Sequence, residues 1–509
     1  RETNYVLLGI AFLILFIAGI NFTNLTTSLI PLRLKTINTH RVLGCSIYKL
    51  QAISLIESIV ICLISYILAL FIVNDLSYTP IANWVDADIR LSQYKGLILL
   101  TALIAILTGC LAGLYPAIRS TSYAPALVLK GSFGLSPKGK KVRVALIGFQ
   151  YTVSIALIIV TLFMGLQNHF MTSSEQLGFN KDQVAIVNLT PEIYAKHKPQ
   201  YIQKLKDYPG IEDVAFSVYE LSKEDDMIDL EYARHEDKDV FFKVFYASEN
   251  FLSVMDIQVE EGRDFTREDL NKAQSDYIIN PAAERDFHLH PGDRFNDRTV
   301  LGVSKDFRFN SCRIASSPFV FALNNDIPNP KLVSYIRFNS KTNLQEAVAH
   351  VRETLKEIDP TFPFEISFYN TILNNLYQKE QTLGKLISLF GIMAILISIV
   401  GVFGLVLFET QYRRKEIGIR KINGATTGQI LLMFNKTYIR IVSVCFIISI
   451  PIAWMGTQQW LENFAYKTPL HLWVFIVAFL IILSVTIGTV TFRNWQAANE
   501  NPVNSVKSE

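Results

Sequence analysis

The stretch QYRRKEIGIRKINGATTGQ, residues Gln411 to Gln429, follows directly on a long apolar run and fixes how the chain is oriented. Its basic residues lie at the end of that run and are Arg413, Arg414, Lys415, Arg420 and Lys421. Such a cluster marks the cytoplasmic end of a membrane helix. Glu416 precedes Arg420 by four residues, the favourable order for a helical surface pair. Gly424 is suited to end that helix, so the sequence predicts a short basic helix on the inner membrane face.

We call residues 413–424 the second elbow and predict that a cytosolic partner presses on it. The residues assigned to this contact are Arg413, Arg414, Lys415, Glu416, Ile417, Gly418, Arg420, Lys421 and Gly424. The alternative is that these charges only fix topology, because every multi-pass membrane protein needs basic inner loops.

Composition places the chain among multi-pass membrane proteins. Half of its 509 residues are hydrophobic and the mean hydropathy is +0.27, which is too apolar for one soluble domain. A membrane helix needs about 20 apolar residues. Seven such runs lie at about 5–30, 52–73, 96–118, 144–166, 383–408, 438–456 and 470–492. We expect an α-helical membrane protein with seven spans and one α+β extracytoplasmic domain.

Loop charges give the topology. The loop after the first run carries Arg33, Lys35, His40, Arg41 and Lys49 without an acid, so it faces the cytoplasm. Alternation then places residues 167–381 outside and the C-terminal tail inside. This order puts the N-terminus outside, and the chain starts at Arg1 rather than Met. We therefore expect an N-terminal part, with at least one more span, to precede Arg1.

The chain contains an internal repeat. RLKTINTHRVLGCS (33–46) parallels RRKEIGIRKINGAT (413–426), and each segment is followed by two further apolar runs. The first elbow, with Arg33, Lys35, Arg41 and Gly44, has Thr36 in place of Glu416 and is expected to be the weaker contact. The expected domains are a first membrane unit (1–143), a connecting span (144–166), the outer domain with its stalk (167–381) and a second membrane unit (382–509).

The outer domain shows a mixed α/β pattern. Segments rich in β-branched and aromatic residues predict strands at 184–189, 240–246, 277–279, 300–303, 319–323, 333–338 and 364–369. Apolar residues at helical spacing predict a helix at 344–358, capped by Asn343 with Glu346 and followed by Pro360. Residues 372–381 keep a helical pattern into the fifth run and predict a continuous stalk helix.

Chemical motifs are weak. Residues 134–140, GLSPKGK, fit the spacing of a phosphate-binding loop, but Lys141 stands where Ser or Thr is needed. A flexible basic loop is the better interpretation. His288 and His290 can share one strand face for a metal, but a surface pair without a third ligand is favoured. With no catalytic motif in the sequence, we expect neither enzymatic activity nor a metal or cofactor in this chain.

Glu57 lies just inside the second apolar run. A carboxylate within a membrane segment is by default a candidate functional group. Because Glu57 is close to the cytoplasmic end, pairing with Lys49 or contact with interfacial water is the milder interpretation, and we favour it.

Together these features resemble the FtsX-like permease family of ABC transporters, with an outer domain similar to the MacB-like periplasmic core. The segments that carry the resemblance are RRKEIGIRKINGAT (413–426), GLYPAIRSTSYAPALVLKG (113–131), LGFNKDQV (177–184), EGRDF (261–265), GVSKDFRF (302–309), WLENFAYKTPL (460–470) and NPVNSVKSE (501–509). The chain looks most like the eight-span tandem type without its N-terminal part.

The resemblance implies a membrane subunit that couples ATP hydrolysis by a separate cytosolic ATPase dimer to movement of the outer domain. ATP and Mg²⁺ would then bind to the partner. The cargo would be a peptide, lipoprotein or drug, handled at the bacterial inner membrane, with an extracytoplasmic adaptor as a further partner. One alternative is a regulator that controls a cell-wall hydrolase or senses a peptide. Another is an ion-coupled transporter, although its usual mid-membrane ionisable pair is missing from the sequence.

Overall fold

The computed structural model describes residues 2–79, 82, 90–122, 137–173, 177–222, 229–272, 274–308, 311–323 and 332–499. The chain forms two compact units. Unit 1 comprises Arg1–Gly165, Thr382–Gln459 and Pro469–Glu509, and unit 2 comprises Leu166–Gln381 with Trp460–Thr468. The loop Trp460–Thr468, which the sequence analysis assigned to the second membrane unit, thus groups with the outer domain.

Unit 1 consists of long apolar helices. Those with spanning length are α1 (Glu2–Val42), α2 (Ile47–Leu76), α3 (Lys95–Thr121), α5 (Pro137–Thr172), α12 (Gln378–Tyr412), α14 (Thr427–Leu461) and α15 (Leu472–Ala498). Two short elements are the 3₁₀ turn η2 (Leu91–Gln93) and α13 (Arg414–Ile422). Within the described residues seven helices are long and apolar enough to cross a membrane, as the sequence predicted.

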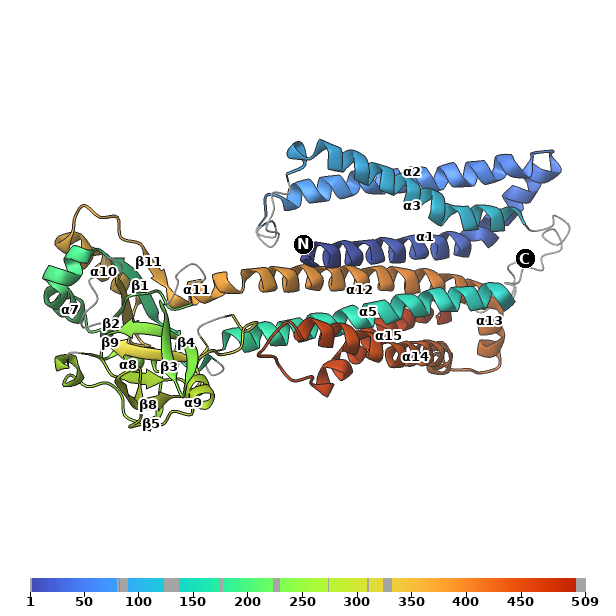
Figure 1. Ribbon diagram of the computed structural model, residues 1–509. Helices are drawn as coiled ribbons and strands as arrows, with labels where there is room; N and C mark the ends of the chain where they lie inside the picture. Colours follow the sequence, from blue (N-terminus) through green and yellow to red (C-terminus); the bar gives the residue numbers. More distant parts are fainter. Residues whose placement is uncertain are drawn as a thin grey trace. The chain divides into compact units, whose positions relative to one another are not determined.

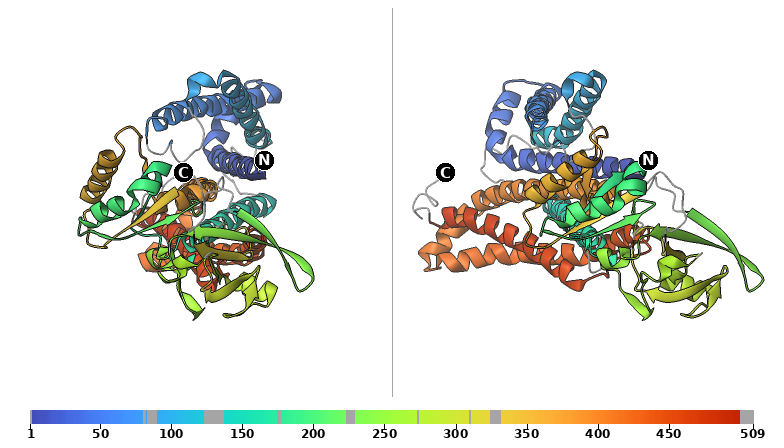
Figure 2. Two further views of the ribbon diagram at one scale, coloured as in Figure 1. Left: turned by 60° about the vertical axis from the view of Figure 1, so that its left-hand side comes forward. Right: turned by 90° about the vertical axis from the view of Figure 1, so that its left-hand side faces the viewer.

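Helices α1, α2 and α3 lie side by side, drawn in blue in Figures 1 and 2. Helix α1 packs on α12, where the Asn21 side-chain amide donates to the carbonyl of Ile397 at 2.6 Å. A Cβ added at Gly401 would lie 2.3 Å from Asn21, and one at Gly404 would lie 1.9 Å from Leu25. Small residues at these two positions therefore allow the close approach, as is common between membrane helices.

Helix α5 is the central helix of a second group, which consists of α5, α12, α14 and α15. In the most apolar stretch of α5, 50% of the residues are buried inside the protein, against 6% in α2. Ser154 exchanges a hydrogen bond with Ser398 of α12 at 2.9 Å, and Tyr151 with Thr486 of α15 at 3.0 Å. These hydroxyl pairs satisfy polar atoms that the bilayer interior cannot hydrate.

Unit 2 is built on one sheet in the order β11-β1-β10-β2-β4-β9-β6-β8-β5, with β3 paired to β4 and β7 to β8. The strands are β1 (Val184–Leu189), β2 (Ile211–Ser217), β3 (Asp229–His235), β4 (Lys238–Ala247), β5 (Val259–Gly262), β6 (Tyr277–Ile279), β7 (Arg294–Phe295), β8 (Arg298–Ser304), β9 (Phe319–Leu323), β10 (Leu332–Phe338) and β11 (Ile366–Phe368). The pairs β4–β9 and β6–β8 are parallel, and the other pairs are antiparallel.

The helical elements of unit 2 are η3 (Ile193–His197), α7 (Lys198–Lys206), α8 (Phe251–Met255), η4 (Asp269–Asn271), α9 (Pro281–Phe287), α10 (Leu344–Ile358) and α11 (Tyr369–Leu376). All seven predicted strands are present, and α10 has the predicted bounds. Asn343 caps it by accepting from the Gln345 amide at 3.1 Å and bonding Glu346 at 2.8 Å. The sequence analysis missed β2, β3, β5 and β7, whose polar or short segments lack the apolar alternation of the others.

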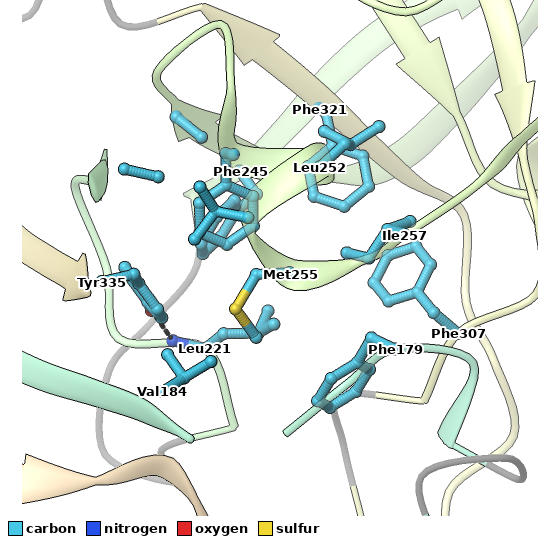
Figure 3. Packing of buried hydrophobic residues seen from close by; sticks show 14 of the residues in the cluster. Phe179, Val184, Leu221, Phe245, Leu252, Met255, Ile257, Phe307, Phe321 and Tyr335 are labelled. Atoms are coloured by element: carbon cyan, nitrogen blue, oxygen red, sulfur yellow. Dashed lines mark hydrogen bonds between the residues drawn. The ribbon is translucent and has the colours of Figure 1, made fainter. Parts of the chain in front are cut away.

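Strand β1 is buried on both faces because its side chains alternate between two cores. Val184 and Ile186 join the cluster that also contains Met255 and Phe245, whereas Ala185 and Val187 face α7 and α10. Figure 3 shows the first cluster closing around Met255, with the Leu221 amide donating to the Tyr335 hydroxyl at 2.8 Å. Because both faces of β1 are buried, its sequence VAIVNL is rich in β-branched apolar residues, the pattern from which the strand was predicted.

Three segments that carried the family resemblance meet through glycine contacts. Gly178 has φ +77°, and a Cβ there would lie 2.1 Å from the carbonyl oxygen of Asp306. Gly262 has φ +79°, and a Cβ there would lie 2.2 Å from the carbonyl oxygen of Leu301. Only glycine tolerates both the backbone angle and the absence of space. The segments 177–184, 261–265 and 302–309 are therefore packing motifs of the outer domain.

The prediction of a continuous stalk helix was wrong. Helix α11 ends at Leu376, Tyr377 has φ −104° and ψ 12°, and α12 begins at Gln378. The Tyr377 side chain is 1% exposed, and its hydroxyl accepts from the Cys312 amide at 3.2 Å. This tertiary contact ties down the residue at which the helix breaks, and local helical periodicity does not show it.

Candidate functional site

The second elbow forms the predicted short helix, α13, between α12 and α14. Two features end it. The Gly424 amide donates to the Lys421 carbonyl at 3.0 Å and the Ala425 amide to the Arg420 carbonyl at 2.9 Å, while Gly424 has φ +86°. This pattern is a Schellman C-cap, which satisfies the last helical carbonyls.

Helix α14 starts with a reciprocal cap immediately after this turn. The Gln429 amide donates to the Thr426 hydroxyl at 3.3 Å, and the Thr426 amide donates to the Gln429 side chain at 3.1 Å. Such a capping box fixes the direction in which a helix starts. Only Ala425 thus lies between the two caps, so α13 and α14 are joined with little slack.

The charges of the second elbow are paired along the helix surface. Arg420 donates to Glu416 at 2.8 Å, and Arg413 lies 3.6 Å from Glu409 and 4.0 Å from Glu416. The Arg420 side chain is half exposed, so its pairing with Glu416 leaves it available to a partner. A pair of this kind stabilises the helix by only about 0.5 kcal/mol.

The elbow has an inner and an outer face. Ile417 and Gly418 are buried, whereas Ile419 and Ile422 are exposed and Lys421 is partly buried. The side chains of Arg414 and Lys415, which the sequence analysis assigned to the same contact, lie outside the described residues. Behind Arg420 the surface is hollowed by an open pocket of about 510 Å³, lined by Arg420, Asn423, Gly424, Ala425, Gln429 and Ile430.

The first elbow has the same turn without the separate helix. Helix α1 runs unbroken to Val42, Gly44 has φ +91°, and the Cys45 amide donates to the His40 carbonyl at 3.0 Å. Ser46 caps α2 by accepting from the Lys49 amide at 3.4 Å.

The first elbow's basic side chains bond to neighbouring helices. Arg33 donates to Glu57 of α2 at 2.7 Å, and Arg41 donates to the Thr121 carbonyl of α3 at 3.2 Å. The side chain of Lys35 lies outside the described residues. Because α2 and α3 hold Arg33 and Arg41, the first elbow is tied to its own unit.

Glu57 is therefore paired with Arg33, where the sequence analysis considered Lys49. Both side chains are almost half exposed. The carboxylate reaches solvent and a cation together, which fits the milder of its two interpretations.

His288 and His290 of the outer domain do not share a site. His288 ends α9 with φ 53°, whereas His290 lies 3.6 Å from Glu284. Glu261 completes a group whose potential ligand atoms lie within 4.8 Å of one another. The sequence analysis missed this grouping because Glu261 is distant in the chain. Since the His290 side chain is 69% exposed, we assign it no metal.

Comparison with known proteins identifies the membrane units. The model for FtsX-like permease C-terminal regions matches residues 8–125 and 388–502. Those segments contain the two elbows, so the match confirms the internal repeat.

Curated relatives point the same way. The macrolide export ATP-binding/permease protein MacB of Aggregatibacter actinomycetemcomitans is 25% identical over 212 residues, which are 39% of this chain and 32% of the relative. MacB of Neisseria gonorrhoeae is 25% identical over 223 residues, which are 41% of this chain and 34% of the relative. The chain spans about a third of the length of these curated relatives.

Solved structures give two further likenesses. The periplasmic region of MacB from Actinobacillus actinomycetemcomitans is 15% identical, with a TM-score of 0.29, over 39% of this chain and 94% of that one. The extracellular domain of the ABC-type transporter YknZ from Gram-positive bacteria is 15% identical, with a TM-score of 0.27, over 36% of this chain and 99% of that one. The two family-model segments, which together cover a little under half of the chain, and the MacB relatives make this chain an FtsX/MacB-like multi-pass permease of the inner membrane whose residues 167–381 are extracytoplasmic.

Proposed function

We propose that this chain converts ATP hydrolysis by a separate cytosolic ATPase dimer into movement of its extracytoplasmic domain, which exports or extracts a peptide, lipoprotein or drug. The chain itself then carries no catalytic site, and ATP with Mg²⁺ binds to the partner. The relatives named as macrolide export proteins support the export class.

The observation that carries this proposal is the hollow at the second elbow. Its wall combines a half-exposed guanidinium, Arg420, with the exposed residues Asn423 and Gly424. A partner side chain entering it meets a cation and the polar Asn423, and the exposed Ile419 and Ile422 add apolar surface. Contact surfaces between proteins combine such features.

The caps at both ends of the turn make the elbow suited to transmit force. Gly424 and Thr426 close α13 and open α14 through backbone hydrogen bonds. A push on α13 therefore moves α14, because the joint contains no flexible linker that would absorb the displacement.

The test is a charge reversal at the contact. We expect Arg420→Glu to abolish co-purification of the cytosolic ATPase with the full chain, because it replaces the exposed cation and repels Glu416. The matched control is Arg234→Glu, the same change at an exposed residue near the end of β3 that pairs with Asp237 at 3.5 Å. The control is expected to retain the ATPase.

Mass spectrometry of the material purified from membranes identifies the companion. Recovery of the ATPase with Arg420→Glu in wild-type amount would refute the elbow contact. ATP hydrolysis by the isolated chain would refute the proposal that a separate subunit carries the ATPase. A stable extracytoplasmic protein partner without substrate-stimulated efflux would favour the regulator over the exporter.

A further inference from the structure

The loop Trp460–Thr468, between α14 and α15, is held by a side-chain amide of α5. Gln167 is fully buried; its Nε2 donates to the Tyr466 carbonyl at 3.0 Å, and its Oε1 accepts from the Thr468 amide at 2.8 Å. The bonded groups lie two residues apart, so the amide binds the loop as a neighbouring β-strand would. Both ends of the amide are used, so the site is specific for glutamine.

Backbone groups of the outer domain hold the same loop from another side. The Tyr466 amide donates to the Cys312 carbonyl at 3.1 Å, and the Ser316 amide donates to the Tyr466 hydroxyl at 3.1 Å. Cys312 is 1% exposed and packs with Met171, Tyr377 and Phe464. Tyr466 is therefore fixed at its backbone and at the end of its side chain.

Two arginines close the arrangement with cation–π contacts. Arg308 lies 4.0 Å from the ring centroid of Tyr466, and Arg313 lies 5.0 Å from that of Phe464. Arg313 also donates to Glu380 of α12 at 2.8 Å. Parts of α5 and α12, residues 308 and 311–316, and the loop after α14 thus meet in one cluster within unit 2.

We propose that this loop is a third attachment, besides α5 and α12, through which motion of α14 reaches the outer domain, with Gln167 as its positioning residue. The inference rests on the proposed function, because α14 begins directly after the second elbow. A loop that served only to connect two membrane helices would not need a dedicated buried amide and two arginine–ring contacts.

The experiment uses the full chain with its co-purified ATPase in lipid nanodiscs, followed by hydrogen exchange with and without ATP. Gln167→Met removes both hydrogen bonds of the side-chain amide while keeping a similar side-chain volume. We expect exchange of the 460–468 peptide to rise at least tenfold, while β1 stays protected and the ATPase stays bound. The ATP-dependent change in outer-domain exchange should fall at least fivefold.

Tyr466→Phe is the matched control, because it removes only the hydroxyl bond to Ser316 and keeps the ring under Arg308. It is expected to retain most of the ATP response. If Gln167→Met also exposes β1, Tyr466→Leu takes its place, since it removes the arginine–ring contact from the loop side and should cause the same loss of ATP response.

A full ATP-dependent response in Gln167→Met, or in Tyr466→Leu where that variant takes its place, would overturn the third attachment and leave the proposed function standing. A wild-type complex that binds the ATPase yet shows no ATP-dependent change in the outer domain would overturn the proposed function instead. The two failures are therefore distinguishable.

Discussion

Two glycines of the outer domain, Gly178 and Gly262, combine a positive φ with a close contact to another backbone segment. We expect Gly178→Ala and Gly262→Ala each to lower the free energy of unfolding by about 3 kcal/mol, through strain and overpacking. Gly292 also has positive φ, +99°, but a Cβ added there would have no other atom within 4 Å. Gly292→Ala should cost only about 1 kcal/mol.

Thermal unfolding of the purified full chain, followed by hydrogen exchange in β1 and β10, compares these three variants. Equal losses in all of them would show that the contacts with Asp306 and Leu301 contribute nothing beyond the backbone angle.

The Asp269 carboxylate organises the turn after the EGRDF segment. Arg263 donates to both of its oxygens at 2.7 and 2.8 Å, and Thr266 adds its amide at 2.9 Å and its hydroxyl at 2.8 Å. These hydrogen bonds, the guanidinium's first, hold the pKa of Asp269 well below its usual range. The stabilisation is present at neutral pH and is lost as the pH falls below about 4, the unfolded value, towards the folded one.

Asp269→Asn should cost about 2 kcal/mol at pH 7, a modest value because Arg263 is half exposed. The difference from wild type should shrink at pH 3, when the wild-type carboxyl starts to protonate. Urea unfolding at both pH values measures it, with the highly exposed Asp237→Asn as control. A loss that is the same at both pH values would contradict the assignment.

At the scale of elements, the two elbows share one turn and differ in what holds their charges. Gly44 and Gly424 end helices in the same way, yet Arg33 pairs across to α2 whereas Arg420 pairs within α13. The weaker role predicted for the first elbow stays a prediction, and this difference in pairing is its structural argument.

The substitution Glu57→Gln tests the role of the ion pair at the first elbow. Because the pair with Arg33 is almost half exposed, its loss should cost at most about 1 kcal/mol. We expect ATPase association and ATP hydrolysis by the complex to stay within twofold of wild type, in contrast to Arg420→Glu. A large loss of coupled activity would instead identify Glu57 as a functional membrane carboxylate.

At the scale of the whole molecule, sidedness follows from the loop charges and is open to labelling. In a background without other cysteines, D237C in the β3–β4 turn, where Asp237 is 97% exposed, should react with an impermeant maleimide on intact cells. In a second background that keeps only the native Cys45, this thiol, partly buried at the first elbow, should react only after permeabilisation. Labelling of Cys45 in intact cells would show that the topology is the reverse of the one predicted.

The sequence by itself determined the number and order of the membrane helices, the short helix of the second elbow, the repeat and the seven strands with alternating apolar residues. These features depend on local periodicity, apolar length and the side of the membrane that basic residues prefer, all of which act over neighbouring residues.

Only the tertiary structure decided the break at Tyr377, the partner of Glu57 and the attachment of the loop Trp460–Thr468 to the outer domain. Gln167 and Tyr466 are 299 positions apart, and Asn21 and Ile397 are 376 apart. The pairing of such groups depends on which buried donors and acceptors the completed fold brings together, because each must be satisfied where water is excluded. No local pattern in the chain encodes that choice.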